Sequence, residues 1–275
     1  MRLILHHKLG LTGLFLLLII LAITITGIFW TPHDPFKIDY SEVLVPPGLG
    51  GHLLGTDALG RDVLSRILYG ARFTLLIGLT ITSVSIVIGT IIGMTCGLLG
   101  GIYDLAVSRL LDVVLALPDI LIALAIAAVL KPGLTSVLIA VSAVGWRDFA
   151  RFARAETLKW KEYGFVEAAR AYGTSFWRIL FHHILRNLLP IILIYSSLYA
   201  PGAILTASAL SFLGIGLQPP TPEWGVLISE GKLYLVFAWW VATFPGIVLM
   251  MLVLGLNFIG DAFRDTLDPR ARRGI

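Results

Sequence analysis

The chain has 275 residues, of which 57% are apolar and only 14% are charged. An ordinary soluble domain carries about 25% charged residues, so this composition excludes a water-soluble globule. The net charge is +4, but the chain contains no soluble module with a basic face and interleaved aromatic residues, which argues against a nucleic-acid partner. The lone cysteine, Cys96, excludes an intrachain disulfide and a metal site made of paired cysteines.

Six apolar stretches divide the chain, and each is a candidate transmembrane helix. A helix needs about 20 residues to cross the hydrocarbon core of a bilayer. The stretches cover residues 10–30, 73–102, 113–130, 132–146, 187–222 and 233–260. The first is longer than the apolar core of a signal peptide, so it is interpreted as a retained anchor. The sequence therefore predicts an all-α, polytopic membrane protein with six transmembrane helices.

The placement of basic residues predicts the orientation of these helices. Fourteen of the 21 Lys and Arg residues lie in three segments, namely the N-terminus 1–9, the loop 147–187 and the tail 261–275. Six spans place all three segments on one face, and the positive-inside rule assigns that face to the cytoplasm. Both termini are therefore predicted to be cytoplasmic, and residues 73–275 are predicted to form the core that contains spans two to six.

The connection 31–72 is predicted to lie outside the cell membrane and to contain an amphipathic helix. Asp57 can cap a helix that runs to Tyr69, with its apolar residues on one face. Arg61, Asp62 and Arg66 are expected to point elsewhere. Such a helix can lie along the membrane surface, either as a packing element or as a docking element for a partner.

The longest cytoplasmic connection, 147–187, is predicted to fold as a helix, a tight turn and a second helix. Gly173 ends the first helix, because glycine readily adopts a positive φ, and Ser175 can cap the second. Ala168 and Ala169 present no bulky side chain, so this helix can approach another protein closely. The alternative is a helical hairpin that merely joins two membrane helices.

Two features inside the spans carry further expectations. Gly89, Gly93, Gly97 and Gly101 recur every four residues, which predicts close packing with another helix, favoured here to be one of the same chain. Asp119 is an ionisable residue within a span, and such residues often mark a transport path. It is therefore the candidate for lining a water-filled translocation path.

The sequence carries no motif for catalysis or metal binding. It lacks the phosphate-binding loop, the zinc-protease motif and the nucleophile elbow, so no catalytic residue, cofactor or metal site is predicted. The six histidines do not suggest a site. His182 and His183 diverge by about 100° on a helix, and the others are terminal or lie in the 31–72 connection.

The 147–187 loop resembles the EAA motif of ABC importer permeases. The matching residues are Glu167-Ala168-Ala169, then Gly173, then Ile184-Leu185. Subfamily members usually continue with a proline, where this chain has Arg186. Three further runs, at 52–66, 211–225 and 260–270, look like the dipeptide, oligopeptide and nickel permease subfamily, and in particular like its C-type subunit.

The resemblance implies the type I ABC importer permease fold and roles for two sets of residues. One set would couple the permease to an ATPase subunit, and comprises Glu167, Ala168, Ala169, Arg170 and Gly173. The other set would dock an extracytoplasmic binding protein on the 57–69 helix and the 219–225 segment, and comprises Arg61, Asp62, Arg66, Glu223 and Trp224.

The sequence is accordingly interpreted as half of the translocation path of an ATP-driven importer in a bacterial or archaeal cytoplasmic membrane. The implied partners are a homologous B-type permease, one or two kinds of ATPase subunit that carry ATP and Mg, the binding protein and membrane lipid. The cargo would be di- or oligopeptides, or else nickel or a metal chelate. A secondary transporter driven by an ion gradient is the first alternative and predicts internal repeats. A membrane enzyme is the second.

Overall fold

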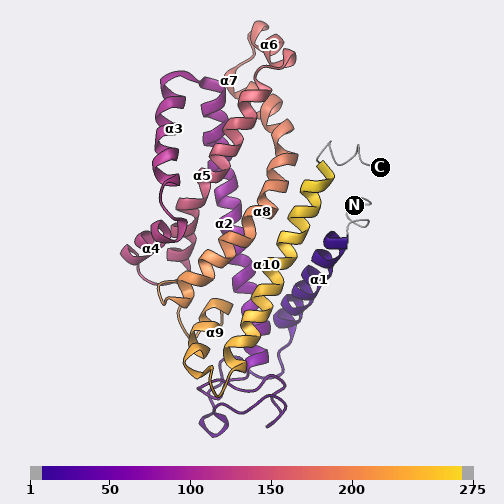
Figure 1. The fold of residues 1–275 in the computed structure, drawn as a ribbon, viewed down its shortest axis with the longest axis vertical. Helices are drawn as coiled ribbons and strands as arrows, with labels where there is room; N and C mark the ends of the chain where they lie inside the picture. Colours follow the sequence, from indigo (N-terminus) through magenta and orange to yellow (C-terminus); the bar gives the residue numbers. More distant parts are fainter. Residues whose placement is uncertain (1–7, 268–275) are drawn as a thin grey trace.

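The computed structural model describes residues 8–267, and the regular structure in this part of the chain is helical, with two isolated β-bridges as the only strand-like pairings (Figure 1). His6 and His7, and the part of the predicted cytoplasmic tail from residue 268 onward, lie outside the described residues. The all-α prediction is confirmed for residues 8–267.

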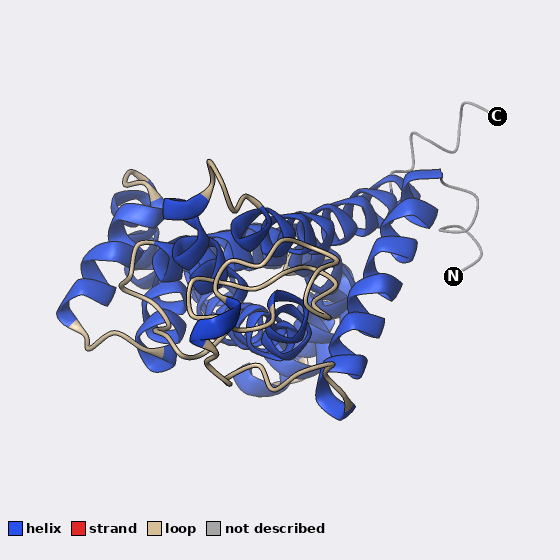
Figure 2. Ribbon diagram, turned by 90° about the horizontal axis from the view of Figure 1, so that it is seen from below, coloured by secondary structure: helices blue, strands red, loops and turns tan. Residues whose placement is uncertain are grey.

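The long helices run side by side along the molecule, with the short helix α6 beyond one end and residues 30–62 beyond the other (Figure 1). The long helices are α1 (Lys8–Phe29), α2 (Val63–Leu99), α5 (Leu134–Trp160), α8 (Leu185–Phe212) and α10 (Trp240–Leu267). The shorter ones are α3 (Gly101–Leu115), α4 (Asp119–Val129), α6 (Gly164–Ala171), α7 (Phe176–Arg178), the π-helix η3 (Ile179–Ile184) and α9 (Trp224–Gly231). Viewed along the bundle, the loops of residues 30–62 lie across its end (Figure 2).

Four of the described helices are long and apolar enough to cross a membrane, and a fifth span results if α3 and α4 are counted together. The predicted continuous helix over 113–130 is wrong, because α3 and α4 meet at a bend of 91°. Pro118 explains the break, since it lacks a backbone N–H and stands in extended conformation as the N-cap of α4. The fourth predicted span corresponds to the first half of α5, whose second half carries charges. The count of six spans is therefore not established by helix length and composition.

The separate amphipathic helix predicted from Asp57 to Tyr69 is also wrong. Asp57 holds a turn, because its carboxylate accepts hydrogen bonds from the backbone N–H groups of Leu59 and Arg61. The helix begins at Val63, where the Asp62 carboxylate accepts the N–H of Ser65, and it continues unbroken into the membrane as α2. With 37 residues, α2 is about 55 Å long at 1.5 Å per residue, and the hydrocarbon core is about 30 Å thick. Its first turns therefore project beyond the bilayer.

The glycine stripe predicted in the second span packs against α5 of the same chain. A Cβ at Gly89 would lie 2.2 Å from the carbonyl oxygen of Trp146, and one at Gly93 would lie 2.3 Å from that of Ala150. A Cβ at Gly97 would lie 2.8 Å from Cβ of Thr157 and 3.0 Å from the carbonyl oxygen of Arg154. Gly101 is not part of this contact, since it starts α3 in open space with φ +60°. Close backbone approach of this kind is how small residues hold membrane helices together.

Replacing Gly93 with alanine should therefore lower the stability of the bundle. The added methyl group forces α2 away from α5, and overpacking of this kind costs about 1–3 kcal/mol. Gly246→Ala in α10 is the matched control, because no atom lies within 4 Å of a Cβ there. Thermal unfolding of the detergent-purified protein measures both. Equal melting temperatures for the two variants would contradict the packing argument.

Candidate functional site

The helix–turn–helix predicted in the 147–187 loop is present at the α6 end of the bundle. Gly173 has φ +73°. Its N–H donates to the carbonyl oxygen of Arg170 at 2.9 Å, and the N–H of Thr174 donates to that of Ala169 at 3.0 Å. These two bonds form the Schellman motif, in which glycine ends a helix in the left-handed conformation. The second helical segment starts after Ser175, as predicted, although the Ser175 side chain makes no capping hydrogen bond.

The exposed face of α6 is formed by small and charged residues, together with Phe165 in its first turn. Val166 is fully buried and fixes the helix to a core cluster with Leu180 and Ile184, while Ala169 is half-buried against the same cluster. Glu167, Ala168, Arg170 and Ala171 are exposed. The apolar residue Tyr172 is 90% exposed next to the turn, and Trp177 is exposed after it. Large exposed apolar side chains around a helix with a smooth face are typical of a protein-contact surface.

Helix α5 leads into α6, which lies beyond the end of the bundle (Figure 1). The loop is shorter than the predicted 147–187, because α5 continues to Trp160. The Arg154 guanidinium donates to the Asp104 carboxylate of α3 at 2.7 Å, and Lys161 donates to the carbonyl oxygen of Gly97 at 3.3 Å. Trp160 also packs against Tyr163 at the entry to α6. These contacts connect the entry to α6 with α2, α3 and α5.

Asp119 lies where α4, α5 and α8 enclose a pocket of about 390 Å³. Its side chain is 55% exposed and contacts the guanidinium of Arg147, which is itself buried. Arg147 also donates to the carbonyl oxygen of Val114 at 2.6 Å, near the end of α3. Because Pro118 bends the chain there, the first turn of α4 brings Asp119 to the pocket.

The pocket combines charges with hydroxyl groups inside an otherwise apolar bundle. Asp148 lines it, with an oxygen 3.9 Å from Nε of Arg147. Tyr195, Tyr199 and Thr206 of α8 line the opposite side. A Cβ at Gly145 would lie 1.8 Å from the hydroxyl of Tyr199, so only glycine admits the ring in this position. Charged groups inside a membrane bundle are costly and typically face a water-filled path.

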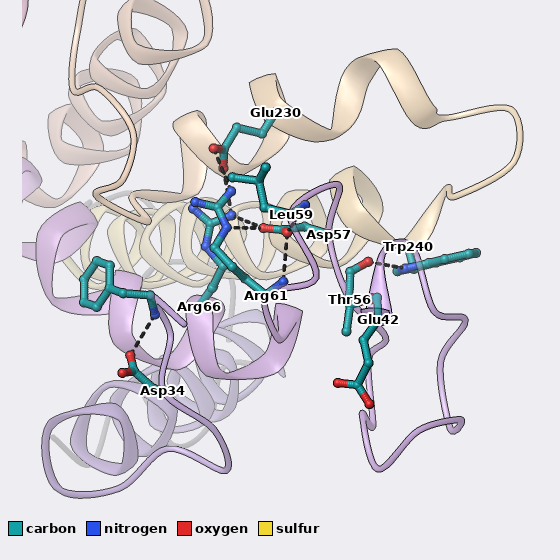
Figure 3. Close-up of polar contacts among 10 residues, drawn as sticks. Asp34, Glu42, Thr56, Asp57, Leu59, Arg61, Arg66, Glu230 and Trp240 are labelled. Atoms are coloured by element: carbon teal, nitrogen blue, oxygen red, sulfur yellow. Dashed lines mark hydrogen bonds and ion pairs between the residues drawn. The ribbon is translucent and has the colours of Figure 1, made fainter. Parts of the chain in front are cut away.

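A buried ion network joins residues 30–62 to α9 at the opposite end of the molecule (Figure 3). Arg61 pairs with Asp57 at 2.7 Å and with Glu230 of α9 at 2.9 Å. Arg66 pairs with the same two carboxylates, at 2.8 Å in the case of Glu230. Arg61 and Arg66 are only 4% and 1% exposed. The expectation that these two arginines face outward is therefore wrong, because opposite charges from a distant segment hold them inside.

The other predicted docking residues are buried as well. Trp224 is fully buried and donates its indole N–H to the carbonyl oxygen of Ile67 at 3.1 Å. Glu223 caps α9 and accepts the hydroxyl of Ser208 at 3.1 Å. Burial raises the pKa of the Glu223 carboxyl. Asp62 is 3% exposed as the cap of α2. These residues are buried beneath the surface at this end of the molecule and hold its segments in place. They are not accessible to a partner.

Two histidines that the sequence leaves apart come together among residues 30–62. The rings of His33 and His52 lie 4.5 Å apart between centroids. His52 contacts the Asp62 carboxylate with Nδ1 at 2.8 Å and the Glu42 carboxylate with Nε2 at 2.9 Å. Although burial favours the neutral ring, these hydrogen bonds raise the pKa of His52. The sequence did not predict this pair, because the two histidines are far apart in the chain.

Sequence reasoning missed four residues that these sites use. Arg147 counted as a charge of the cytoplasmic loop, yet it lies inside the bundle beside Asp119. Asp57 was placed at a helix cap, whereas it neutralises two arginines. Glu230 and Tyr199 carried no signal, because each acts through a contact with a residue far away in the sequence. For Arg147 the sequence offers one hint: Asp119 and Arg147 stand before and after two adjacent apolar stretches, so two antiparallel helices would bring them together.

These features define a multi-pass membrane protein with a charged pocket inside its bundle and an exposed helical knob at one end. Residues 85–273 match the family of binding-protein-dependent transport system inner membrane components. Residues 1–47 match the N-terminal transmembrane domain of oligopeptide transport permease C. The chain belongs to the family of inner-membrane components of binding-protein-dependent transport systems.

Curated relatives cover nearly the whole chain. The probable D,D-dipeptide transport system permease protein of Escherichia coli (strain K12) is 36% identical over 94% of this chain and 87% of its own length. The di/tripeptide transport system permease protein of Pseudomonas aeruginosa is 38% identical over 97% and 90%. The glutathione transport system permease protein of Pectobacterium atrosepticum is 40% identical over 98% and 90%.

The family decides between the alternatives that the sequence left open. The chain is a permease subunit of an ABC importer, a transport subunit and not an enzyme, and it resides in the inner membrane as one component of a multi-subunit system. The resemblance to the C-type permeases is confirmed. The alternative of a secondary transporter driven by an ion gradient is not supported.

Proposed function

We propose that this chain forms one half of an ATP-driven import path for short peptides. The relatives at 36–40% identity are named for D,D-dipeptides, di- and tripeptides and glutathione. The pocket beside Asp119 fits such cargo chemically. A zwitterionic peptide carries an ammonium group that the carboxylates of Asp119 and Asp148 attract, and amide groups that tyrosine hydroxyls can bind.

The observation that carries the proposal is the geometry of α6. A helix with a smooth exposed face, anchored through Val166 and ended by the Gly173 turn, has the shape of a knob that fits a groove on a soluble partner. That partner is an ATPase subunit, which binds ATP and Mg and receives Glu167, Ala168 and Arg170. Closure of two ATPase subunits then moves α6, and α5 carries this motion to the walls of the pocket.

The remaining partners are proposed from the resemblance to C-type permeases. A homologous B-type permease supplies the other wall of the path. An extracytoplasmic binding protein delivers the peptide to the 30–62 end, where Tyr40, Leu49 and Leu53 are exposed. The buried residues Arg61, Asp62, Arg66, Glu223 and Trp224 support this surface. In this arrangement both termini and α6 face the cytoplasm.

Peptide uptake by the complete complex in proteoliposomes tests the function. With ATP inside the vesicles and loaded binding protein on the side of residues 30–62, labelled dipeptide should accumulate. Excess unlabelled di- or tripeptide should compete, and free amino acids should not. Uptake should persist when ionophores collapse the ion gradients. Uptake without ATP, or competition by amino acids as strong as by peptides, would contradict the proposal.

Single cysteines in a Cys96→Ala background test the orientation. Cys96 is buried, so its loss removes the native thiol without exposing a surface. An impermeant maleimide applied to intact cells should label Leu53→Cys and leave Glu162→Cys unlabelled until the cells are opened. The reverse pattern would invert the topology. In the same background, Thr206→Cys should react with a small reagent at a rate that changes when ATP is bound, because Thr206 lines the path.

A further inference from the structure

Three potential metal ligands converge among residues 30–62 from three different places in the sequence. His33 follows the end of α1, His52 lies in the middle of the segment, and Asp62 caps α2. One ligand atom from each of the three residues lies within 4.8 Å of the other two. The two imidazole rings are tilted by 38° and do not stack face to face, so their nitrogens can point to a common centre.

The three residues are held in place by further contacts. The second carboxylate oxygen of Asp62 accepts the N–H of Ser65 at 2.7 Å. The hydroxyl of Ser65 in turn accepts the backbone N–H of His33 at 2.9 Å. Ser65 therefore fixes two of the three residues at once, and such outer contacts are what orient ligands in metal sites. His52 is oriented by the Glu42 carboxylate, which contacts its Nε2 at 2.9 Å.

A small cavity of about 40 Å³ lies between these residues, and its charge favours a cation. Its lining includes the carboxylates of Asp34, Asp39 and Glu42 in addition to the three candidate ligands. Apart from the two histidines, Lys37 is the one basic residue of the lining, and its ammonium group lies 3.7 Å from the carboxylate of Asp39. The cavity is large enough for one ion and far too small for a peptide.

We propose that His33, His52 and Asp62 bind one divalent transition-metal ion, with zinc as the best fit. Two imidazoles and a carboxylate are a typical three-residue zinc set, which leaves a fourth position for water. Calcium and magnesium prefer oxygen ligands alone. Zinc holds such ligands at about 2.0–2.2 Å, which places them about 3.4 Å apart. Binding therefore replaces the 2.8 Å hydrogen bond between His52 Nδ1 and Asp62 with bonds to the metal, and it draws in the exposed ring of His33.

The bound ion would join the end of α1 to the start of α2. Residues 30–62 contain no long helix, and their shape otherwise depends on turns and on the ion network with Glu230. An ion held by residues 33, 52 and 62 adds a cross-link over most of this segment. Its position at the end opposite α6 exposes it to extracytoplasmic zinc, a placement that follows from the proposed topology. The binding itself does not depend on that topology or on transport.

Zinc titration of the full-length, detergent-purified permease tests the proposal. After removal of metal with a chelator, a competing fluorescent zinc indicator should report one tight equivalent. His33→Ala should weaken this binding by at least 10-fold, since it removes one of the three ligands. His33 suits the test, because its ring is exposed and its contacts are a weak one of 3.4 Å with the carbonyl oxygen of Gly51 and the ring contact with His52. His182→Ala removes an exposed histidine elsewhere and should bind zinc like the wild type.

A second measurement keeps the result independent of folding. Cobalt(II) in the site should give the visible absorption of a four-coordinate ion in the wild type and in His182→Ala, and lose it in His33→Ala. Saturating zinc should raise the melting temperature of the wild type and not that of His33→Ala. Absence of a tight equivalent in the wild type, equal affinity in His33→Ala, or loss of binding in His182→Ala would each overturn the proposal.

Discussion

Gly173→Val should abolish substrate uptake while the permease still inserts into the membrane in normal amounts. Gly173 has φ +73°, and the left-handed conformation costs an ordinary L-residue about 1–2 kcal/mol and a β-branched one more. Valine therefore opens the Schellman turn and changes the direction in which α6 projects. The variant should also lose ATPase subunits on copurification, or leave ATP hydrolysis running without transport.

Two control variants separate backbone conformation from side-chain bulk. Gly164→Val adds the same side chain at the start of α6, where a Cβ also meets no atom within 4 Å and φ is ordinary, so uptake should be retained. Gly173→Asn should retain much of the uptake, because asparagine tolerates a positive φ. Normal uptake and a normally assembled complex in Gly173→Val would show that α6 is not the coupling element. A bulky side chain on the contact face of α6 is best tested with Ala168→Trp. Ala168 is exposed, whereas a tryptophan at half-buried Ala169 would also disturb the packing of α6 itself.

Asp57→Asn should be the most destabilising single change at the other end. The substitution keeps an oxygen for the turn but leaves Arg61 and Arg66 sharing the one remaining carboxylate of Glu230. Breaking a buried ion pair by removal of one partner costs about 3–5 kcal/mol. We expect a large fall in the melting temperature of the purified protein. We also expect that loaded binding protein stimulates ATP hydrolysis by the assembled complex less than in the wild type.

An exposed pair in the same segment is the matched control. Lys37 lies 3.7 Å from Asp39 with its side chain 71% exposed, so Lys37→Ala should leave the melting temperature unchanged. Glu230→Gln should destabilise the protein in the same sense as Asp57→Asn. The loss of unfolding free energy in the double variant should differ from the sum of the losses in the two single variants, because both carboxylates bind the same guanidinium groups. A melting temperature of Asp57→Asn equal to that of the wild type would contradict the role of the network.

The elements that the sequence predicted correctly depend on short-range rules. Gly173 as a helix stop and the start of a helix after Ser175 follow from the backbone preferences of single residues. The first apolar span coincides with α1 because a run of apolar residues needs no partner to be recognised. The glycine stripe predicted close packing, but only the structure shows that α5 is the partner and that Gly101 is excluded.

The elements that failed depend on contacts between distant residues. Arg61 and Arg66 look like exposed charges of an amphipathic helix until Glu230, 164–169 positions later, is placed beside them. Arg147 looks like a loop residue until the bend at Pro118 brings Asp119 to it. In both cases the sequence gives the charge of each group but not its partner, and the partner determines whether the group is buried.

The long sequence separation within the Arg61–Arg66–Glu230 network also sets an order of events during biosynthesis. At about 5–20 residues per second, synthesis of the chain from Arg66 to Glu230 takes on the order of 10–30 seconds. During that interval the two arginines have Asp57 as their only acidic partner from the network. In chains that stop before Glu230, one carboxylate therefore faces two guanidinium groups, and the network cannot reach the charge balance of the complete protein.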